Sequence, residues 1–173
     1  WTRMTIGGKP HPHSFSRDGA DVRIANVEVR RGKGISIQGG ISGLLVLKST
    51  GSQFHGFVRD EFTTLPEVWD RILSTDVDSV WNWKNFATVA EVKAAVASFD
   101  KAWNDARAIT MKLFAEENSP SVQNTMYKMC EKILEAAPGV ETVEYSLPNK
   151  HYFEIGKSPV TLHMRCLLTC HQT

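Results

Sequence analysis

Residues 74–86, STDVDSVWNWKNF, decide the fold class because apolar and polar side chains alternate along them. This period of two predicts a long β-strand that is buried on one face. Asp76 and Asp78 fall on the opposite face, where they form either a solvated polar surface or a pair of acids for a cation. The buried face is predicted to carry Val77, Ser79, Trp81 and Trp83.

Several strands are expected before this one. Residues 1–18 predict a strand, a turn at residues 7–10 (GGKP) and a second strand. Residues 22–31 alternate again, and a further strand follows the glycine-containing break at residues 32–34. The apolar run at residues 44–47 (LLVL) is typical of a strand buried on both faces.

Two amphipathic helices are expected after the long strand. The second is predicted to begin with Ser119 as its N-cap and Pro120 at its first position, and to end at Pro138. Its apolar stripe is Val122, Met126, Met129, Ile133 and Leu134. The stripe of the first helix is Phe99, Ala102, Trp103, Ala106, Ile109 and Leu113.

A short helix is expected around residues 65–69, and a final hairpin from residue 143 to residue 155 with a turn or kink at Pro148. From residue 35 onward the order is therefore strand, strand, helix, helix, strand, strand. This order predicts an α+β domain, an antiparallel sheet with two helices on one face. The other face and the sheet edges need covering, so oligomerisation is expected.

Composition limits the possible partners. The 173 residues suffice for one full domain, and 20 basic against 19 acidic side chains leave a formal charge of +1. No bulk field favours nucleic acid or an acidic membrane surface, and no apolar run approaches the roughly 18 residues of a membrane span. No secretion leader is evident, and the start at Trp1 suggests a segment upstream.

The cysteines and histidines do not predict a metal site. Three cysteines form an odd, sparse set that favours free thiols in a reducing compartment. Zinc sites usually carry closely spaced cysteine pairs in two separated halves, whereas here a single cluster lies near the chain end. His11 and His13 are interpreted as surface or packing residues. The residues of the terminal cluster are His163, Cys166, Cys170 and His171.

Binding features occur although the common phosphate-loop, zinc-protease and nucleophile motifs are absent. Phe54 follows a strand among small residues, so it either presents a ring to a flat ligand or belongs to the core. Arg71 either forks onto a planar anion or pairs with Asp70 or Glu67.

Two further features lie later in the chain. The N–H of Val122 is among the donors at the start of the helix that have no intrahelical partner, and it could bind an oxygen or anion. The side-chain amide of Gln123 beside it can donate and accept hydrogen bonds. The alternative is an ordinary capped helix with a solvated glutamine. Asn149 and His151 share one face of an extended segment, where an imidazole beside an amide can move protons or simply be structural.

At these positions the sequence resembles the uricases. Residues 44–71, LLVLKSTGSQFHGFVRDEFTTLPEVWDR, look like the uricase signature, and KPHPHSF, SPSVQNTMYKM and ETVEYSLPNKHYFEI extend the resemblance over residues 1–155. The signature positions at the family's spacing are Lys48, Ser49, Thr50, Ser52, Phe54, Phe57, Phe62, Leu65 and Arg71.

The resemblance implies a T-fold and a homotetramer with active sites shared between subunits. It implies cofactor-free oxidation of urate by O2 to 5-hydroxyisourate and hydrogen peroxide, with no metal. Residues 1–31 would be the closing hairpin of a truncated N-terminal T-fold domain, and 32–155 a C-terminal T-fold domain. Residues 156–173 look unlike the family and lack its Ser-Lys-Leu-type ending. The resemblance implies the peroxisome, where the family is found, and the missing signal makes the cytoplasm the alternative.

Site roles follow from the resemblance. Phe54 would stack on the purine, Arg71 would grip one edge of the urate anion, and Gln123 would bind the opposite edge. The N–H of Val122 would meet a urate oxygen. Together with Asn149, these four residues would form the substrate-binding set.

Asn149 would hold O2 or water above the ring and His151 would belong to the proton relay. The family's relay also uses a Lys and a Thr from the N-terminal half, which this chain lacks, and His55 stands where a bulky aromatic is common. Two alternatives remain open: a non-catalytic T-fold remnant, or a T-fold protein for another purine or pterin, where an acid would be expected in place of Gln123.

Overall fold

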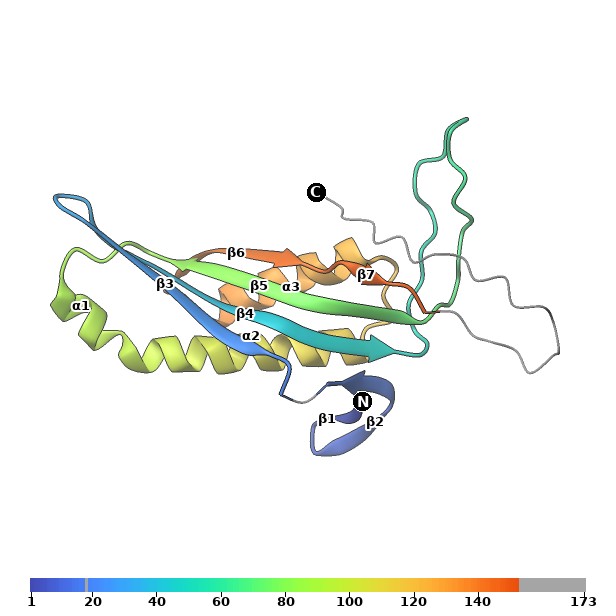
Figure 1. Ribbon diagram of the computed structural model, residues 1–173, viewed down its shortest axis with the longest axis horizontal. Coiled ribbons are helices and arrows are strands. Elements are labelled where there is room, and N and C mark those ends of the chain that lie inside the picture. Colours follow the sequence, from blue (N-terminus) through green and yellow to red (C-terminus); the bar gives the residue numbers. More distant parts are fainter. Residues whose placement is uncertain (18, 153–173) are drawn as a thin grey trace.

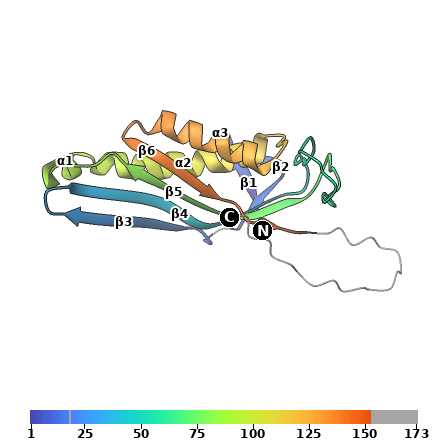
Figure 2. The same cartoon turned by 90° about the horizontal axis from the view of Figure 1, so that it is seen from above.

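The computed structural model describes residues 1–17 and 19–152. They form one antiparallel sheet of seven strands with helices laid along one face (Figure 1, Figure 2), so the expected α+β class is confirmed. The terminal cysteine and histidine cluster and the second half of the expected final hairpin lie outside the described residues. The elements are β1 (Thr2–Ile6), β2 (Lys9–Ser16), β3 (Val22–Arg30), β4 (Gly34–Lys48), β5 (Leu73–Trp83), α1 (Val89–Ala94), α2 (Val96–Glu116), α3 (Val122–Ala136), β6 (Val140–Ser146) and β7 (Asn149–Lys150).

The sheet is built around β4, its longest strand. The order is β1-β2-β4-β5-β6, while β3 pairs with the first part of β4 and β2 with its last residues. The turn between β1 and β2 uses Gly7 and Gly8, both at positive φ, which confirms the predicted reversal. All the strands from β1 to β7 therefore belong to one sheet.

Of the expected final hairpin, the structure describes the first strand and the segment around Pro148, where the chain is interrupted by a kink and not by a turn; most of the second strand, residues 153–155, lies outside the described residues. β6 and β7 both pair with β5, β6 along its second half and β7 at Ser74 and Thr75. Pro148 lies between them and has no N–H for the ladder, so it breaks the pairing without reversing the chain. β7 is thereby held beside the beginning of β5.

The two central strands carry the core. The predicted face of β5 is buried and its opposite face is half-buried, which confirms the alternation. Asp78 accepts hydrogen bonds from Ser42 Oγ at 2.7 Å and from the N–H of Gly43 at 2.9 Å, so this acid supports an irregularity in β4. Residues 44–47 are buried alternately and not on both faces as predicted, because helices cover one face of the sheet only.

Both helices on the sheet are confirmed, with a different start for the second. α2 buries small residues and Phe114 against the sheet, and α3 buries Met129 and Ile133. The N-cap of α3 is Ser121 and not Ser119: the Ser121 hydroxyl accepts a hydrogen bond from the N–H of Asn124 at 3.2 Å. No helix in the described part of the chain is long and apolar enough to cross a membrane.

Candidate active site

The chain leaving β4 is tied to the chain entering α3. Ser52 and Ser119 form an isolated parallel bridge. The N–H of Gln53 donates to the carbonyl of Ser119 at 2.7 Å, and the N–H of Ser119 donates to the carbonyl of Gly51 at 3.0 Å. Two segments separated by more than 60 residues in sequence therefore lie side by side, and Phe54 follows directly after one of them.

A second bridge brings Arg71 to Phe54. Phe54 and Val68 exchange backbone hydrogen bonds of 2.7 and 2.8 Å, so the expected helix at residues 65–69 is wrong and this segment is extended. The N–H of Arg71 donates to the carbonyl of Ser52 at 2.9 Å. As a result the Arg71 guanidinium carbon lies 5.2 Å from the centre of the Phe54 ring.

The Arg71 guanidinium is half-buried and incompletely paired. Its Nε is buried without a hydrogen-bond partner among the described residues, and burial lowers the pKa of the guanidinium below its ordinary value. The alternative partners are occupied elsewhere: Asp70 accepts from Thr50 Oγ1 at 2.6 Å, and Glu67 accepts from the N–H of Gly56 at 2.9 Å. A buried donor left open beside an aromatic ring suits a planar anion.

The Phe54 ring has an aromatic neighbour that the sequence interpretation did not include in the site. Phe57 stacks on it at 4.7 Å between centroids and 21° between planes. His55 instead stacks on Trp69 at 3.9 Å, and its Nε2 lies 3.0 Å from Gln53 Oε1. His55 is therefore engaged by Trp69 and Gln53. The F-x-x-F spacing of the signature was the available signal for Phe57.

Val122 and Gln123 are the first two residues of α3. Their N–H groups belong to the first turn, where no carbonyl of the helix itself lies within reach. The Ser121 hydroxyl takes the N–H of Asn124, and the Ser121 carbonyl takes that of Thr125 at 3.2 Å. The cap thus serves Asn124 and Thr125, and Ser121 is a cap that the sequence interpretation missed. The donor role of the Val122 N–H and of the Gln123 side-chain amide stays a prediction.

Asn149 and His151 reach the same region through β7. Thr75 pairs with Asn149 and Ser74 with Lys150, close to the start of β5 and hence to Arg71. The side chain of Lys150 forms an ion pair with Asp76. Because side chains alternate along an extended segment, Asn149 points to the face opposite Lys150.

The six predicted residues belong to segments that meet at one end of the sheet. These segments are the end of β4, the beginnings of β5 and α3, and β7 (Figure 1). Among the six residues the structure gives a direct side-chain contact for Phe54 and Arg71. The other four are brought to this end by the bridges and strand pairs described above. A cavity of about 340 Å³ lies at the opposite end, near Trp83 and Pro138, and none of the six lines it.

Lys48 is a residue of this region whose burial the sequence interpretation missed. It ends β4 with 1% of its surface exposed, and its ammonium donates to the carbonyl of Glu117 at 2.7 Å. Burial lowers its pKa to about 8. Its even spacing from Leu44 and Val46 was the signal that this lysine faces the core.

Comparisons with known proteins show the family of the chain. The family model described as Uricase matches residues 37–166, which continues past Ile155, where the sequence resemblance was expected to stop. The chain is 63% identical over 158 residues to the uricase of Aspergillus flavus, covering 91% of this chain and 52% of that protein. It is 38% identical to the uricase of Oryctolagus cuniculus over 167 residues, with 94% and 53% covered.

Solved structures give the same result. The crystal structure of uricase from Arthrobacter globiformis superimposes with a TM-score of 0.68 at 40% identity, covering 89% of this chain and 50% of that one. The fold is thus the T-fold form of an α+β sheet. The chain spans about half the length of the curated relatives it matches. With a family model over most of its length and the arginine, ring and helix start assembled at one end, the chain belongs to the uricase family.

Proposed function

We propose that this chain is the C-terminal half of an enzyme that oxidises urate with O2, and that it supplies the substrate-binding residues. The observation that carries the proposal is the Arg71 guanidinium, half-buried beside the Phe54 ring with its Nε unpaired. Family membership supplies the ligand class, since the relatives that the chain matches are uricases.

Four residues would bind the urate anion. Phe54 offers a ring for stacking, and Arg71 offers two parallel N–H donors for one edge of the purine. The bridge between Ser52 and Ser119 connects the segment before Phe54 to the segment before α3, which supports a role for the Val122 N–H and the Gln123 amide at the remaining polar edge. Gln123 can both donate and accept, as a lactam edge requires.

Asn149 and His151 would act on the oxygen side. The overall change is urate plus O2 plus water to 5-hydroxyisourate plus hydrogen peroxide, in which urate loses two electrons and O2 gains them. The amide of Asn149 would hold O2, and afterwards water, over the ring, while His151 passes protons between the reactants near neutral pH. Deprotonated urate supplies the electrons, so no cofactor is needed.

The site would be completed by a second chain segment, and the whole enzyme would be a homotetramer with sites between subunits. The loop between β4 and β5, which projects from the sheet (Figure 1), supports this proposal because it exposes large apolar side chains. Val58 is 94% exposed and Phe62 is 81% exposed. We also propose that residues 1–31 close an N-terminal T-fold domain, that residues 32–155 form the C-terminal one, and that the Lys and Thr of the relay lie in the absent half.

The proposal is tested on a completed chain, in which this sequence is joined to the half of Aspergillus flavus uricase that it does not match. We expect the completed chain to consume urate and O2 in equal amounts and to release one hydrogen peroxide per urate. Urate is followed by its ultraviolet absorbance and O2 with an electrode. Folded completed protein that leaves urate unchanged would refute the proposed function.

A further inference from the structure

Lys48 is a long cationic side chain that is completely enclosed at the end of β4. It follows Leu44 and Val46 on the core-facing side of the strand, and its neighbours in the sheet are Ser14 on β2 and Leu73 on β5. Burying a cation is unfavourable unless specific contacts compensate for the lost water. The contacts that hold this ammonium therefore indicate what it does.

The ammonium is held by the end of α2. It donates to the carbonyl of Glu117, the C-cap residue of this 21-residue helix, and lies 5.6 Å from the centre of the Phe114 ring. The C-terminal end of a helix carries unpaired carbonyls and partial negative charge, which stabilise a cation. In the described part of the chain no carboxylate forms an ion pair with Lys48.

The hydrogen bond from Lys48 joins the same two chain segments as the Ser52–Ser119 bridge of the candidate site. Glu117 precedes Ser119 by two residues, and Lys48 precedes Gly51 by three. The Lys48 bond and the two backbone bonds between Gly51, Gln53 and Ser119 therefore connect the same two segments. The hydrogen bond of Lys48 is the first of these three bonds along the chain.

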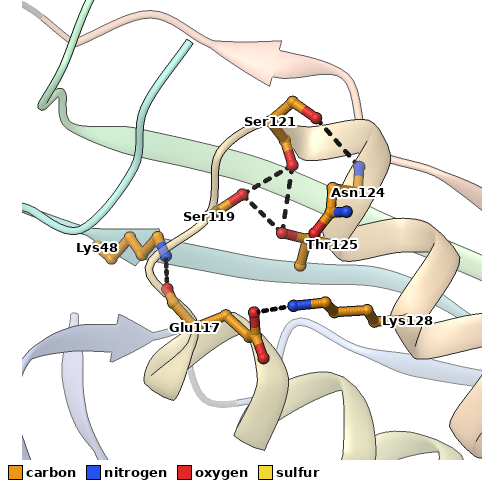
Figure 3. Close-up of polar contacts among 7 residues, drawn as sticks. All are labelled: Lys48, Glu117, Ser119, Ser121, Asn124, Thr125 and Lys128. Carbon is orange, nitrogen blue, oxygen red and sulfur yellow. Dashed lines mark hydrogen bonds and ion pairs between the residues drawn. The ribbon is translucent and has the colours of Figure 1, made fainter. Parts of the chain in front are cut away.

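The α2–α3 connection is fastened to α3 as well (Figure 3). The Glu117 carboxylate pairs with Lys128 at 2.6 Å, and the Ser119 hydroxyl lies 2.6 Å from the Thr125 hydroxyl. Lys48 and Lys128 thus hold opposite parts of the same residue, Glu117, one from the sheet and one from the helix.

We propose that Lys48 is a positioning residue for urate binding: through the Glu117 carbonyl it fixes the start of α3 relative to the Phe54 ring. The inference rests on the proposed function, because this spacing matters for activity only if urate lies between Phe54 and the donors of Val122 and Gln123. Lys48 acts through the backbone of the two segments and does not itself contact the substrate.

Amide hydrogen exchange on the completed chain tests the positioning directly. In Lys48→Met, exchange at the amides of Gln53 and Ser119 should rise by about tenfold or more, because the neighbouring bond of their ladder is lost. Amides in the middle of β4 and β5 should keep their wild-type exchange. Lys132→Met, which removes an exposed lysine paired with Glu135, is the matched control and should change none of these amides. Unchanged exchange at Gln53 and Ser119 in Lys48→Met would overturn the proposal.

Kinetics separate positioning from general stabilisation. We expect the KM of Lys48→Met for urate to rise about tenfold, with kcat per folded enzyme within about threefold of wild type. A purely structural lysine would instead lower the folded fraction at constant KM, and that result contradicts the proposal. Lys48→Arg keeps a cation and should raise KM less than Lys48→Met; it also serves as the test variant if Lys48→Met does not fold.

The two proposals fail separately. If the unsubstituted completed chain leaves urate unchanged, the proposed function fails, while the exchange result still decides whether Lys48 holds the two segments together. If the completed chain is active and Lys48→Met matches it in exchange and KM, the positioning role fails and the proposed function stands.

Discussion

Arg71 is the residue on which the proposed anion clamp depends. Its Nε lacks a partner within the described residues, and both nearby carboxylates that the sequence offered are engaged by other groups. The residue type and the spacing suggested an anion clamp or an ion pair. Only the fold, which directs Asp70 to Thr50 and Glu67 to Gly56, separates these alternatives.

Replacing Arg71 tests this role at the residue scale. In the completed chain, Arg71→Ala should weaken urate binding by about 100-fold, because two hydrogen bonds from a charged donor are lost. Arg30→Ala, which removes an exposed arginine paired with Glu28 far from the site, is the control. Urate affinity is measured by equilibrium titration. An affinity that barely changes in Arg71→Ala would contradict the proposed binding of the urate anion by this arginine.

The pKa of Lys48 predicts a pH dependence of stability. Burial lowers this pKa to about 8 from an ordinary value of 10.5, so between these pH values the unfolded chain binds more protons than the folded one. The contribution of Lys48 to the free energy of unfolding therefore rises with pH across that window, by about 3 kcal/mol at most. The free energy of unfolding, measured with denaturant from pH 7.5 to 10, should increase in the wild type and lack this increase in Lys48→Met. The same pH dependence of stability in both proteins would contradict the lowered pKa of Lys48.

At the scale of elements, periodicity predicted the long strands and both long helices, because their burial follows local patterns of two and of three to four residues. The ends of elements were harder. Ser119 and Ser121 both precede α3 and either can cap a helix; tertiary pairing with Gly51 and Thr125 occupies Ser119 and leaves the cap to Ser121. The short α1 carried a detectable capping box in Thr88 and Glu91, which the sequence interpretation did not use.

The cap assignment is testable on its own. Ser121→Ala should lower the free energy of unfolding by about 1 kcal/mol because the N–H of Asn124 loses its acceptor. Ser121→Asp keeps an acceptor at the same position and should stay within a few tenths of a kcal/mol of wild type. Equal losses in both variants, measured by urea unfolding, would show that the Ser121 hydroxyl does not cap α3.

At the scale of the whole molecule, the long-range partners could not be predicted from one sequence. The bridges of Ser52 with Ser119 and of Phe54 with Val68 join segments with no shared pattern, and the pairing of β7 with the beginning of β5 was not foreseen. These contacts determine where the site forms. The chain gathers its predicted binding residues at one end and spans about half of its relatives' length, which together support a site shared with a second segment.

Urate turnover by this chain alone and by the completed chain, measured side by side from ultraviolet absorbance, tests the division of the site most directly. The account predicts no turnover by the 173 residues alone and sustained turnover after the missing half is joined. Comparable turnover by the chain alone would contradict it, because Phe54, Arg71, Val122, Gln123, Asn149 and His151 would then suffice for the reaction.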